Sequence, residues 1–193
     1  LLTMYVIHLI ILAIMGINPI RYVKKTLEVL IFAFTSRSSA GALPLNVQTQ
    51  TQRLGVPEGI ANFSASFGLS IGQNGCAGIY PAMLAIMVAP VAHVDIDIPF
   101  ILTLIAVVVI SSFGVAGVGG GATFASILVL STLNLPVALA GVLISIEPII
   151  DMGRTALNVN DSILAGTGTA RLTGNLDKEK FNSNHYGELS TES

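Results

Sequence analysis

The sequence predicts an all-α membrane protein that combines transmembrane helices with two re-entrant helical hairpins. Of its 193 residues, 52% are hydrophobic and only 10% are charged, whereas a soluble domain carries about 25% charged residues. Three stretches without Asp, Glu, Lys or Arg are each long enough to cross a bilayer, which takes about 20 apolar residues. These stretches are residues 1–20, 59–94 and 98–146. In addition, two apolar segments are interrupted by runs of small residues.

The interruptions lie at residues 35–41 and 111–121, which are rich in Ser and Gly. Backbone groups that face lipid must be hydrogen-bonded internally, so these breaks must be buried in protein or line a wet cavity. We therefore expect each segment to fold as a hairpin that enters and leaves on one side of the membrane. Such a pair of interrupted segments is typical of the binding site of a transporter.

The expected elements follow from these limits in chain order. They are the end of a transmembrane helix (1–17), a first re-entrant hairpin (24–56), a broken transmembrane helix (57–93), a second re-entrant hairpin (98–136), a transmembrane helix with a polar stripe (137–172) and a polar tail (173–193). The two units of hairpin plus helix enter from opposite sides, which predicts an inverted repeat. Because residue 1 lies inside an apolar run without an initiator Met or a basic leader, we expect a C-terminal fragment of a longer membrane protein.

The basic residues gather on one side of this layout. One face holds seven Lys and Arg residues, and the other holds Asp95 and Asp97 without any basic residue. The seven are Arg21, Lys24, Lys25, Arg53, Arg171, Lys178 and Lys180. The positive-inside rule makes the first face cytoplasmic. We predict a multi-pass protein of the cell membrane, in contact with the lipid bilayer and with a cytoplasmic C-terminus.

Composition also excludes several classes of protein. The deficit of charged residues argues against a soluble enzyme. Cys76 is the only cysteine, so no disulfide can form within the chain. A formal net charge of −2 without a basic stripe argues against a nucleic acid partner.

The most informative candidate site is a polar stripe on the last helix. Its members are spaced 4, 3, 4 and 3 residues apart, which places them on one helical face. The stripe consists of Glu147, Asp151, Arg154, Asn158 and Asp161. Each intramembrane charge costs at least about 2.5 kcal/mol, so the stripe must face protein or water. Either it is a structural network in which Asp151 and Arg154 neutralise each other, or it binds a substrate or an ion.

The side chains of the stripe suit an amino acid zwitterion. Arg154 offers a bidentate fork to a carboxylate, Asp151 accepts from an ammonium, and Asn158 serves either group. We expect Arg154 to recognise a distal carboxylate, while Asp151 and Asn158 hold the head group. Asp161 is placed to bind a cation together with backbone carbonyls.

Two further stretches have both a structural and a functional interpretation. Residues 37–39 mark the tip of the first hairpin, where serines either cap the returning helix or lie at free N–H groups that attract an anion. Residues 68–76 either pack closely through their glycines or free carbonyls for a cation, with side-chain oxygens from Ser70 and Asn74. Cys76 is interpreted as a small buried side chain rather than a reactive thiol.

Four motifs in the chain resemble the dicarboxylate/amino acid:cation symporters, the glutamate-transporter-like family. They are Arg37-Ser38-Ser39-Ala40-Gly41-Ala42-Leu43-Pro44, the broken stretch Gly72–Cys76, Ala116-Gly117-Val118-Gly119-Gly120-Gly121 and Asp151-Met152-Gly153-Arg154-Thr155-Ala156-Leu157-Asn158-Val159. The resemblance covers residues 1–172. It implies the end of the sixth transmembrane helix, both hairpins and helices seven and eight, which form most of a mobile transport domain.

The resemblance also implies the residues of the binding sites. Substrate contacts fall on Ser39, Cys76, Val118, Asp151, Arg154, Thr155 and Asn158. Asn158 and Asp161 form a first cation site with the carbonyls of Gly68 and Gly72. Ser70 forms a second with the carbonyls of Ser112, Phe113 and Val115, and Asn74 stands where a third site has its acidic residue.

Within this family, the chain is most similar to the branch that takes up L-cystine in bacteria. The usual Asn-Met-Asp-Gly-Thr of helix seven is Gly72-Gln73-Asn74-Gly75-Cys76 here. The glycines at 72, 119 and 121 and the smaller, less polar Cys76 enlarge the expected cavity for a long substrate. The expected function is symport of an amino acid with a cation, and the alternative substrates are acidic amino acids or C4-dicarboxylates. The coupling cation is sodium or a proton, no other metal or cofactor is expected, and the full-length protein is expected to be a homotrimer.

Functions of other classes fit the sequence less well. An ion channel needs repeated filter loops, an intramembrane enzyme needs an arranged base or metal set, and a purely structural subunit leaves the charged stripe unexplained. We therefore expect a transporter and no enzymatic activity.

Overall fold

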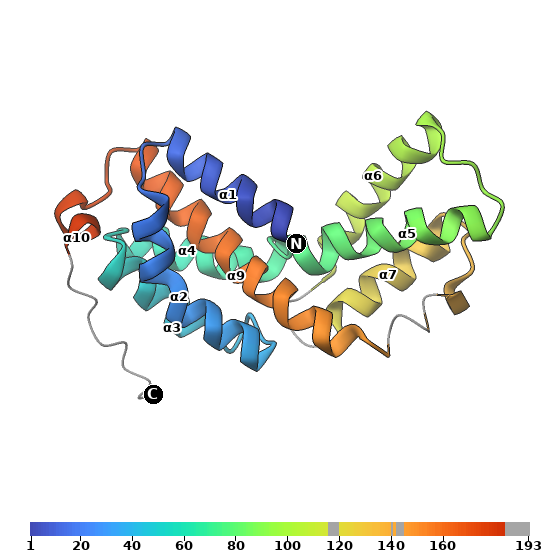
Figure 1. Ribbon diagram of the computed structural model, residues 1–193, viewed down its shortest axis with the longest axis horizontal. Coiled ribbons are helices and arrows are strands. Elements are labelled where there is room, and N and C mark those ends of the chain that lie inside the picture. The colour runs from blue at the N-terminus through green and yellow to red at the C-terminus, as the bar shows by residue number, and fades with distance from the viewer. Residues whose placement is uncertain (116–119, 140, 142–144, 184–193) are drawn as a thin grey trace.

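The computed structural model describes residues 1–115, 120–139, 141 and 145–183, and within these ranges the chain forms helices and no strand. The helices are arranged in two lobes, and one long helix extends from the first lobe to the second (Figure 1). Each lobe has a hydrophobic core of its own. The all-α fold class expected from the sequence is therefore confirmed.

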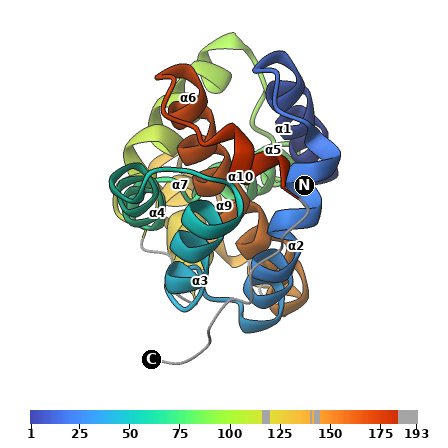
Figure 2. The same cartoon turned by 90° about the vertical axis from the view of Figure 1, so that its left-hand side faces the viewer.

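The first lobe combines the two ends of the chain. It contains α1 (Leu2–Ile14), α2 (Pro19–Ser36), α3 (Leu43–Gln48), the π-helical turn η1 (Thr49–Arg53), α4 (Glu58–Ile71), most of α9 (Glu147–Leu172) and α10 (Lys178–Asn182). Its core includes Leu12, Val29, Leu54 and Ile163, all of which are fully buried. Helix α9 runs through the middle of this lobe, flanked by α1, α2 and α4 (Figure 2).

The second lobe is built from the middle of the chain. It contains the π-helical turn η2 (Asn74–Ile79), α5 (Tyr80–Val91), α6 (Ile98–Ser112), α7 (Gly121–Thr132) and the short 3₁₀ helix η3 (Val137–Leu139). Helix α7 packs against both α5 and α6. Leu84, Val129 and Leu130 are fully buried in its core.

Local sequence explains where several helices begin. Asn18 accepts a hydrogen bond from Arg21 N at 3.1 Å, and Pro19 then opens α2. Asp97 accepts from Phe100 N at 2.8 Å at the start of α6. Both are N-caps, which satisfy backbone N–H groups that have no partner within the helix, and proline is well suited to the first turn.

The last long helix starts later than its expected range of 137–172. Helix α9 begins at Glu147, with Pro148 in its first turn. Among the described residues before it, 137–139 form a 3₁₀ turn instead. Residues 140 and 142–144 lie outside the described residues, and hydrophobicity alone does not indicate which residues of an apolar stretch are helical.

The first expected hairpin brings its two arms back together. Lys25 Nζ, on α2, donates to the carbonyl of Arg53 at 2.7 Å, and Arg53 NH2 lies 2.5 Å from Glu28 Oε2. The returning helix α3 begins at Leu43, later than the serines of the tip. Ser38 Oγ accepts from Gly41 N at 3.0 Å, so this serine closes a turn rather than capping α3.

Part of the expected polar tail is folded onto the first lobe. Asp177 N donates to the carbonyl of Gly55 at 2.9 Å, and Asp177 caps α10 by accepting from Lys180 N. Phe181 is 5% exposed in the core of the lobe. Residues 184–193 of the tail lie outside the described residues.

Much of the surface is apolar. Ile98, Leu102 and Ile110 on α6 and Phe63 on α4 are among many large hydrophobic side chains that are mostly exposed. Over the described residues, the stretch Glu58–Val91 is long and apolar enough to cross a membrane. Three shorter apolar helices accompany it, namely Leu2–Ile14, Ile98–Ser112 and Gly121–Thr132.

Candidate functional site: a charged cluster at a broken helix

The site forms where the helical stretch 58–91 is interrupted. Helix α4 ends at Ile71, Gly72 and Gln73 leave the helical path, and η2 resumes at Asn74 against the face of α9. Gly75 N donates to Asn158 Oδ1 at 2.7 Å. A Cβ atom on Gly75 would lie 3.0 Å from both Asn158 Oδ1 and the carbonyl oxygen of Arg154. The glycine therefore permits the close approach of the broken helix to α9.

Gln73 connects the three segments that meet at this break. Its side-chain oxygen accepts from Asn158 Nδ2 at 2.9 Å and from Ser39 Oγ at 3.4 Å. Its amide nitrogen donates to the carbonyl of Gly68 at 3.0 Å. Gln73 is 3% exposed. Through these hydrogen bonds it connects the tip of the first hairpin to the broken helix and to α9.

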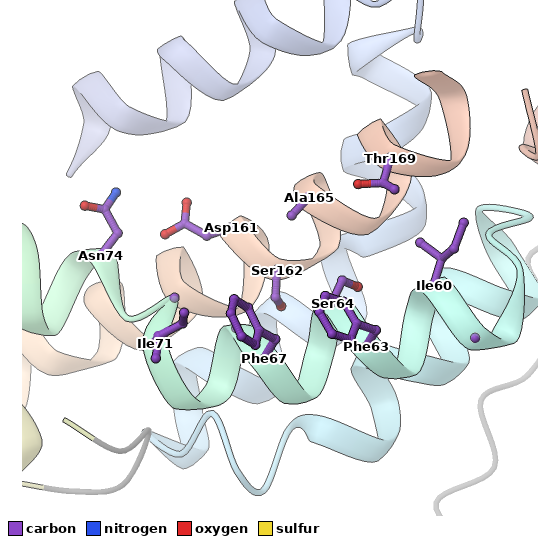
Figure 3. A pocket seen from close by; sticks show the side chains of 13 residues that line it. Ile60, Phe63, Ser64, Phe67, Ile71, Asn74, Asp161, Ser162, Ala165 and Thr169 are labelled. Atoms are coloured by element: carbon purple, nitrogen blue, oxygen red, sulfur yellow. The ribbon is translucent and has the colours of Figure 1, made fainter. Parts of the chain in front are cut away.

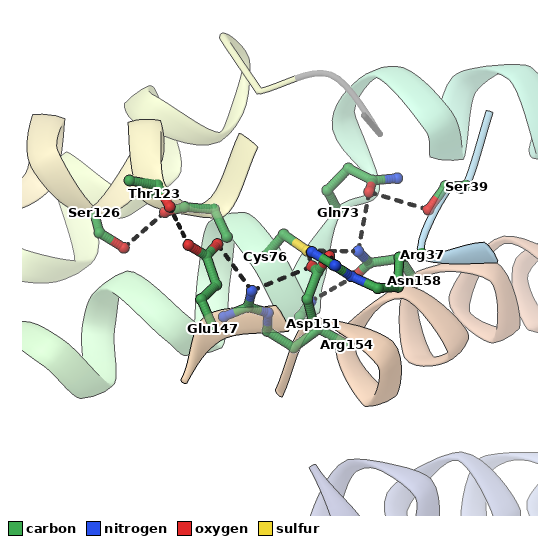
Figure 4. A network of polar contacts seen from close by, with 12 residues as sticks. Arg37, Ser39, Gln73, Cys76, Thr123, Ser126, Glu147, Asp151, Arg154 and Asn158 are labelled. Carbon is green, nitrogen blue, oxygen red and sulfur yellow. Dashed lines mark hydrogen bonds and ion pairs between the residues drawn. The ribbon is translucent and has the colours of Figure 1, made fainter. Parts of the chain in front are cut away.

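A cluster of four charged side chains lies beside Gln73 (Figure 4). Arg154 NH2 lies 3.2 Å from Asp151 Oδ1 and 3.2 Å from Glu147 Oε1. The second oxygen of Asp151 accepts from Arg37 Nε at 3.1 Å. Two arginines and two carboxylates thus form one network with no net charge, in which Arg154, Asp151 and Glu147 are buried and Arg37 is partly exposed.

Arg154 is held on three sides. Its guanidinium carbon lies 4.0 Å from the centroid of the Tyr80 ring, and its side chain is 1% exposed. Glu147, which accepts from Arg154, also accepts a short hydrogen bond from Thr123 on α7. Arg154 Nε and NH1 are buried and form no hydrogen bond of acceptable geometry with any described residue. Buried donors of this kind are costly unless a ligand satisfies them.

The structure brings together most residues that the sequence analysis assigned to the substrate. Ser39, Asp151, Arg154 and Asn158 all belong to the network around Gln73 and Arg154. Cys76 joins it, because its sulfur lies 3.1 Å from Asn158 Nδ2 and 3.9 Å from Asp151 Oδ1. Thr155 is buried on the same helix. Val118, together with the rest of residues 116–119 in the second hairpin tip, lies outside the described residues.

The sequence analysis assigned no direct role in the site to four residues. Arg37 was named only as part of the hairpin tip and Glu147 only as part of the polar stripe. Their elements were thus predicted, but the residues that they contact were not. Gln73 lies inside the glycine-rich stretch, where the glycines drew attention away from its side chain. Tyr80 follows Cys76 by one helical turn, a spacing that places both toward Arg154.

Five of the residues expected to bind cations line one or both of two adjoining cavities. A cavity of about 620 Å³ is lined by Gly68, Gly72, Asn74, Asp161 and Ser162, among others. Asn74 and Asp161 lie on the same side of it (Figure 3). Asp161 Oδ1 is 2.8 Å from His8 Nε2, a partner 153 positions away that the sequence analysis did not foresee. Asp161 Oδ2 is buried without a hydrogen bond of acceptable geometry to a described residue.

The other expected cation ligands lie outside this cavity. The side-chain oxygen of Asn158 is engaged by Gly75 N. A second cavity of about 250 Å³ is lined by Ser112 together with Gly72 and Asn74. Ser70 is exposed and donates to the carbonyl of Ser66 at 3.2 Å. Phe113 is exposed and Val115 is 2% exposed, and neither lines one of these cavities.

The described residues are helical, and a charged cluster lies where one helix is broken. This arrangement is typical of a membrane transporter. Residues 1–172 match the model of the sodium:dicarboxylate symporter family, and the chain belongs to this family. The match ends at the last residue of α9 and includes every residue of the charged cluster.

Curated relatives narrow the comparison. The L-cystine uptake protein TcyP of Shouchella clausii is 70% identical over 182 residues, which are 94% of this chain and 39% of the relative. The L-cystine uptake protein TcyP of Bacillus licheniformis is 66% identical over the same coverage. That of Bacillus thuringiensis is 64% identical over 183 residues. The chain thus spans about two fifths of the length of the curated relatives that it matches.

Proposed function

We propose that this chain is the substrate-carrying part of a secondary transporter that takes up L-cystine together with a cation. The observation that carries the proposal is the buried pair Asp151–Arg154, which lies where the first hairpin tip, the broken helix and α9 meet. Relatives at 64 to 70% identity are named L-cystine uptake proteins. We assign no catalytic residue, because the site binds and releases its ligand unchanged.

The chemistry of the network suits an amino acid. Arg154 has buried donors without partners, which a carboxylate would satisfy in bidentate fashion. Asp151 is the acceptor for an ammonium group, which would replace Arg37 at its second oxygen. Asn158 and Ser39 then contribute hydrogen bonds at the head group, and Cys76, Thr155 and Val118 complete the contact set implied by the family.

The membrane arrangement is part of the proposal. Residues 24–56 and 98–136 form re-entrant hairpins that enter from opposite sides, and 57–93 and 137–172 contain the transmembrane helices, with the C-terminus in the cytoplasm of a multi-pass protein of the cell membrane. The closed base of the first hairpin at Lys25 and Arg53 supports this arrangement. The exposed apolar side chains of α4 and α6 suit contact with lipid or with the remainder of a transporter. The full-length protein is proposed to be a homotrimer, as the family implies.

The coupling cation is sodium or a proton. The buried free oxygen of Asp161 supports a first cation site in the cavity of about 620 Å³, which Gly68, Gly72 and Asn74 also line. Ser112 supports a second in the neighbouring cavity, with Ser70, Phe113 and Val115 assigned to it by family resemblance alone.

Acidic amino acids and C4-dicarboxylates are the second candidate substrate class, and one observation favours them. The unpartnered donors of Arg154 are equally suited to the side-chain carboxylate of an acidic amino acid or a C4-dicarboxylate, and the family description names dicarboxylates. Uptake of radiolabelled substrate by the full-length protein in proteoliposomes separates the two. We expect saturable L-cystine uptake that unlabelled L-aspartate and succinate do not inhibit. Robust aspartate uptake without cystine uptake contradicts the proposal and favours the second class.

Ion replacement in the same assay identifies the coupling cation. An inward sodium gradient at equal pH and an inward proton gradient without sodium are imposed separately. The gradient that drives accumulation above equilibrium is the coupling gradient, and absence of accumulation under both contradicts cation-coupled transport.

A further inference from the structure

Glu147 and Asp151 place two carboxylates on one face of α9, one helical turn apart. Both accept from the same nitrogen of Arg154, at 3.2 Å each. Glu147 is 8% exposed and Asp151 is 6% exposed. A single amino acid head group needs only one of them as a partner for its ammonium. The second buried carboxylate therefore requires its own explanation.

The spacing of the two carboxylates corresponds to that of two linked head groups. Four residues of α-helix advance by about 6 Å. The two α-carbons joined through a disulfide lie about 4.4–6.8 Å apart. The separation of the two α-carbons in such a molecule is thus similar to the backbone rise between Glu147 and Asp151.

The net charge of the cluster also favours a ligand with two complete head groups. Arg37 and Arg154 offset Asp151 and Glu147, so the cluster has no net charge. A ligand with two carboxylates and two ammonium groups is also neutral and preserves this balance when it binds. A ligand with two carboxylates and one ammonium adds an uncompensated negative charge to a buried site, which is costly.

We infer that Glu147 is the acceptor for the second ammonium group of a diamino dicarboxylic acid, while Asp151 accepts the first. The inference rests on the proposed function and names the feature of the ligand that this site selects. In the present structure the Thr123 hydroxyl occupies Glu147 Oε2. An ammonium is a charge-assisted donor and forms the stronger hydrogen bond to a carboxylate, so the ligand would replace this hydroxyl or share the carboxylate with it.

Three probes with one full-length protein test the inference. They are L-cystine, the mixed disulfide of L-cysteine with 3-mercaptopropionate, which lacks one ammonium, and the mixed disulfide of L-cysteine with cysteamine, which lacks one carboxylate. Affinities are measured by competition with labelled L-cystine or by calorimetry. The wild type should bind L-cystine about 10- to 100-fold more tightly than the mercaptopropionate disulfide, the loss expected for one charged hydrogen bond.

The variant Glu147→Gln keeps the side-chain length and a hydrogen bond to Arg154 but removes the charge. We expect it to lose the same factor of about 10 to 100 in affinity for L-cystine and for the cysteamine disulfide. Its affinity for the mercaptopropionate disulfide should stay within about threefold of the wild type, since that probe has no second ammonium to lose. Glu58→Gln, in the first turn of α4 and away from the cluster, is the matched control.

The outcomes separate the two proposals. Equal weakening of all three probes by Glu147→Gln means that Glu147 only positions Arg154, and it overturns the inference while the proposed function stands. The inference is also overturned if the wild type binds the mercaptopropionate disulfide as tightly as L-cystine. This comparison does not depend on the folding of any variant. Wild-type protein that binds none of the probes contradicts the proposed function itself.

Discussion

Arg37 at the tip of the first hairpin donates from Nε to Asp151 Oδ2 at 3.1 Å, across 114 positions of sequence. Asp151 also pairs with Arg154, so its carboxylate is shared by two arginines. The two contacts are unequal, because the Arg37 side chain is 39% exposed and that of Arg154 is 1% exposed. Arg37 is therefore the partner that an incoming ammonium group can displace.

This difference in exposure predicts that substitution of Arg37 and substitution of Asp151 weaken L-cystine binding to different extents. Arg37→Gln should change the affinity for L-cystine by less than about fivefold, because its side chain is 39% exposed and Asp151 keeps Arg154 as a partner. Asp151→Asn should weaken it at least about 100-fold, since it removes the ammonium acceptor and leaves the buried Arg154 with Glu147 as its only carboxylate partner among the described residues. Lys24→Gln, at an exposed position of α2, serves as the control. Equal losses for Arg37→Gln and Asp151→Asn would contradict the displaceable contact.

Arg154→Ala is expected to abolish L-cystine uptake while leaving expression and membrane insertion intact. Arg154→Lys should recover little, because an ammonium lacks the planar fork that binds a carboxylate. Uptake and surface abundance are measured in parallel in cells that lack their own transporters for cystine. A variant that fails to accumulate would instead favour the interpretation of Asp151 and Arg154 as a purely structural network.

Gly75→Ala tests the close contact between the broken helix and α9. The new methyl group would lie 3.0 Å from Asn158 Oδ1 and from the carbonyl oxygen of Arg154, so the two segments must separate. We expect the rate of L-cystine uptake to fall at least about tenfold, which corresponds to about 1.4 kcal/mol. Gly59→Ala is the matched control, because nothing lies within 4 Å of its added Cβ. Similar activity in both variants would show that the contact at Gly75 is dispensable.

His8→Leu should destabilise the protein through Asp161. His8 Nε2 lies 2.8 Å from Asp161 Oδ1, and His8 Nδ1 lies 2.8 Å from Asn160 Nδ2. Removal of the imidazole leaves a largely buried carboxylate without this partner, which costs about 3 kcal/mol. The additional change Asp161→Asn should restore part of that loss, because no buried charge then remains unpaired. Thermal unfolding of the purified full-length protein in detergent measures both effects.

His93→Asn is the control for that series. His93 is exposed and has a φ of 56°, a conformation that asparagine tolerates. Its unfolding temperature should match the wild type. If His8→Leu also matches the wild type, the His8–Asp161 pair does not stabilise the fold.

The hairpin arrangement predicts a labelling pattern. Lys24→Cys and Gln52→Cys, both exposed near the base of the first hairpin, should react with a membrane-impermeant maleimide from the cytoplasmic side. Asp95→Cys, in the loop before α6, should react from the opposite side. Native Cys76 is 8% exposed and should remain unlabelled. Reaction of Lys24→Cys and Gln52→Cys from opposite sides would show that this segment crosses the membrane completely.

The sequence predicted a helical chain, and several helix starts have local signals that the prediction did not use. Asn18 followed by Pro19, and Asp97 followed by Pro99, mark helix starts through caps and a fixed φ that act within a few residues. The glycines of 68–76 marked the break between α4 and α5 for the same reason. The start of α9 was placed too early, since an apolar stretch predicts burial in lipid or protein without indicating which residues are helical.

The candidate site was predictable where one helix carries it. Glu147, Asp151, Arg154 and Asn158 were assigned to one face from their spacing alone, because helical periodicity follows from backbone geometry. Family resemblance added Ser39 and Cys76, which lie on other segments. The partners Gln73 and Tyr80 were not assigned. Nothing near Gln73 indicates which face of α9 it meets, and the spacing of Tyr80 from Cys76 is informative only once Cys76 is known to lie against α9.

The sequence by itself determined that this chain is helical and poor in charge, that two of its segments are broken by small residues, and that its charges converge on one face of the last long helix. Only the tertiary structure decided that Arg37 shares Asp151 with Arg154, and that His8 pairs with Asp161. Propensities, caps and periodicity act over a few residues, whereas these pairs join positions 114 and 153 apart. Such contacts depend on how whole helices pack, because the cost of burying a charge is relieved only by whichever partner the fold brings within reach.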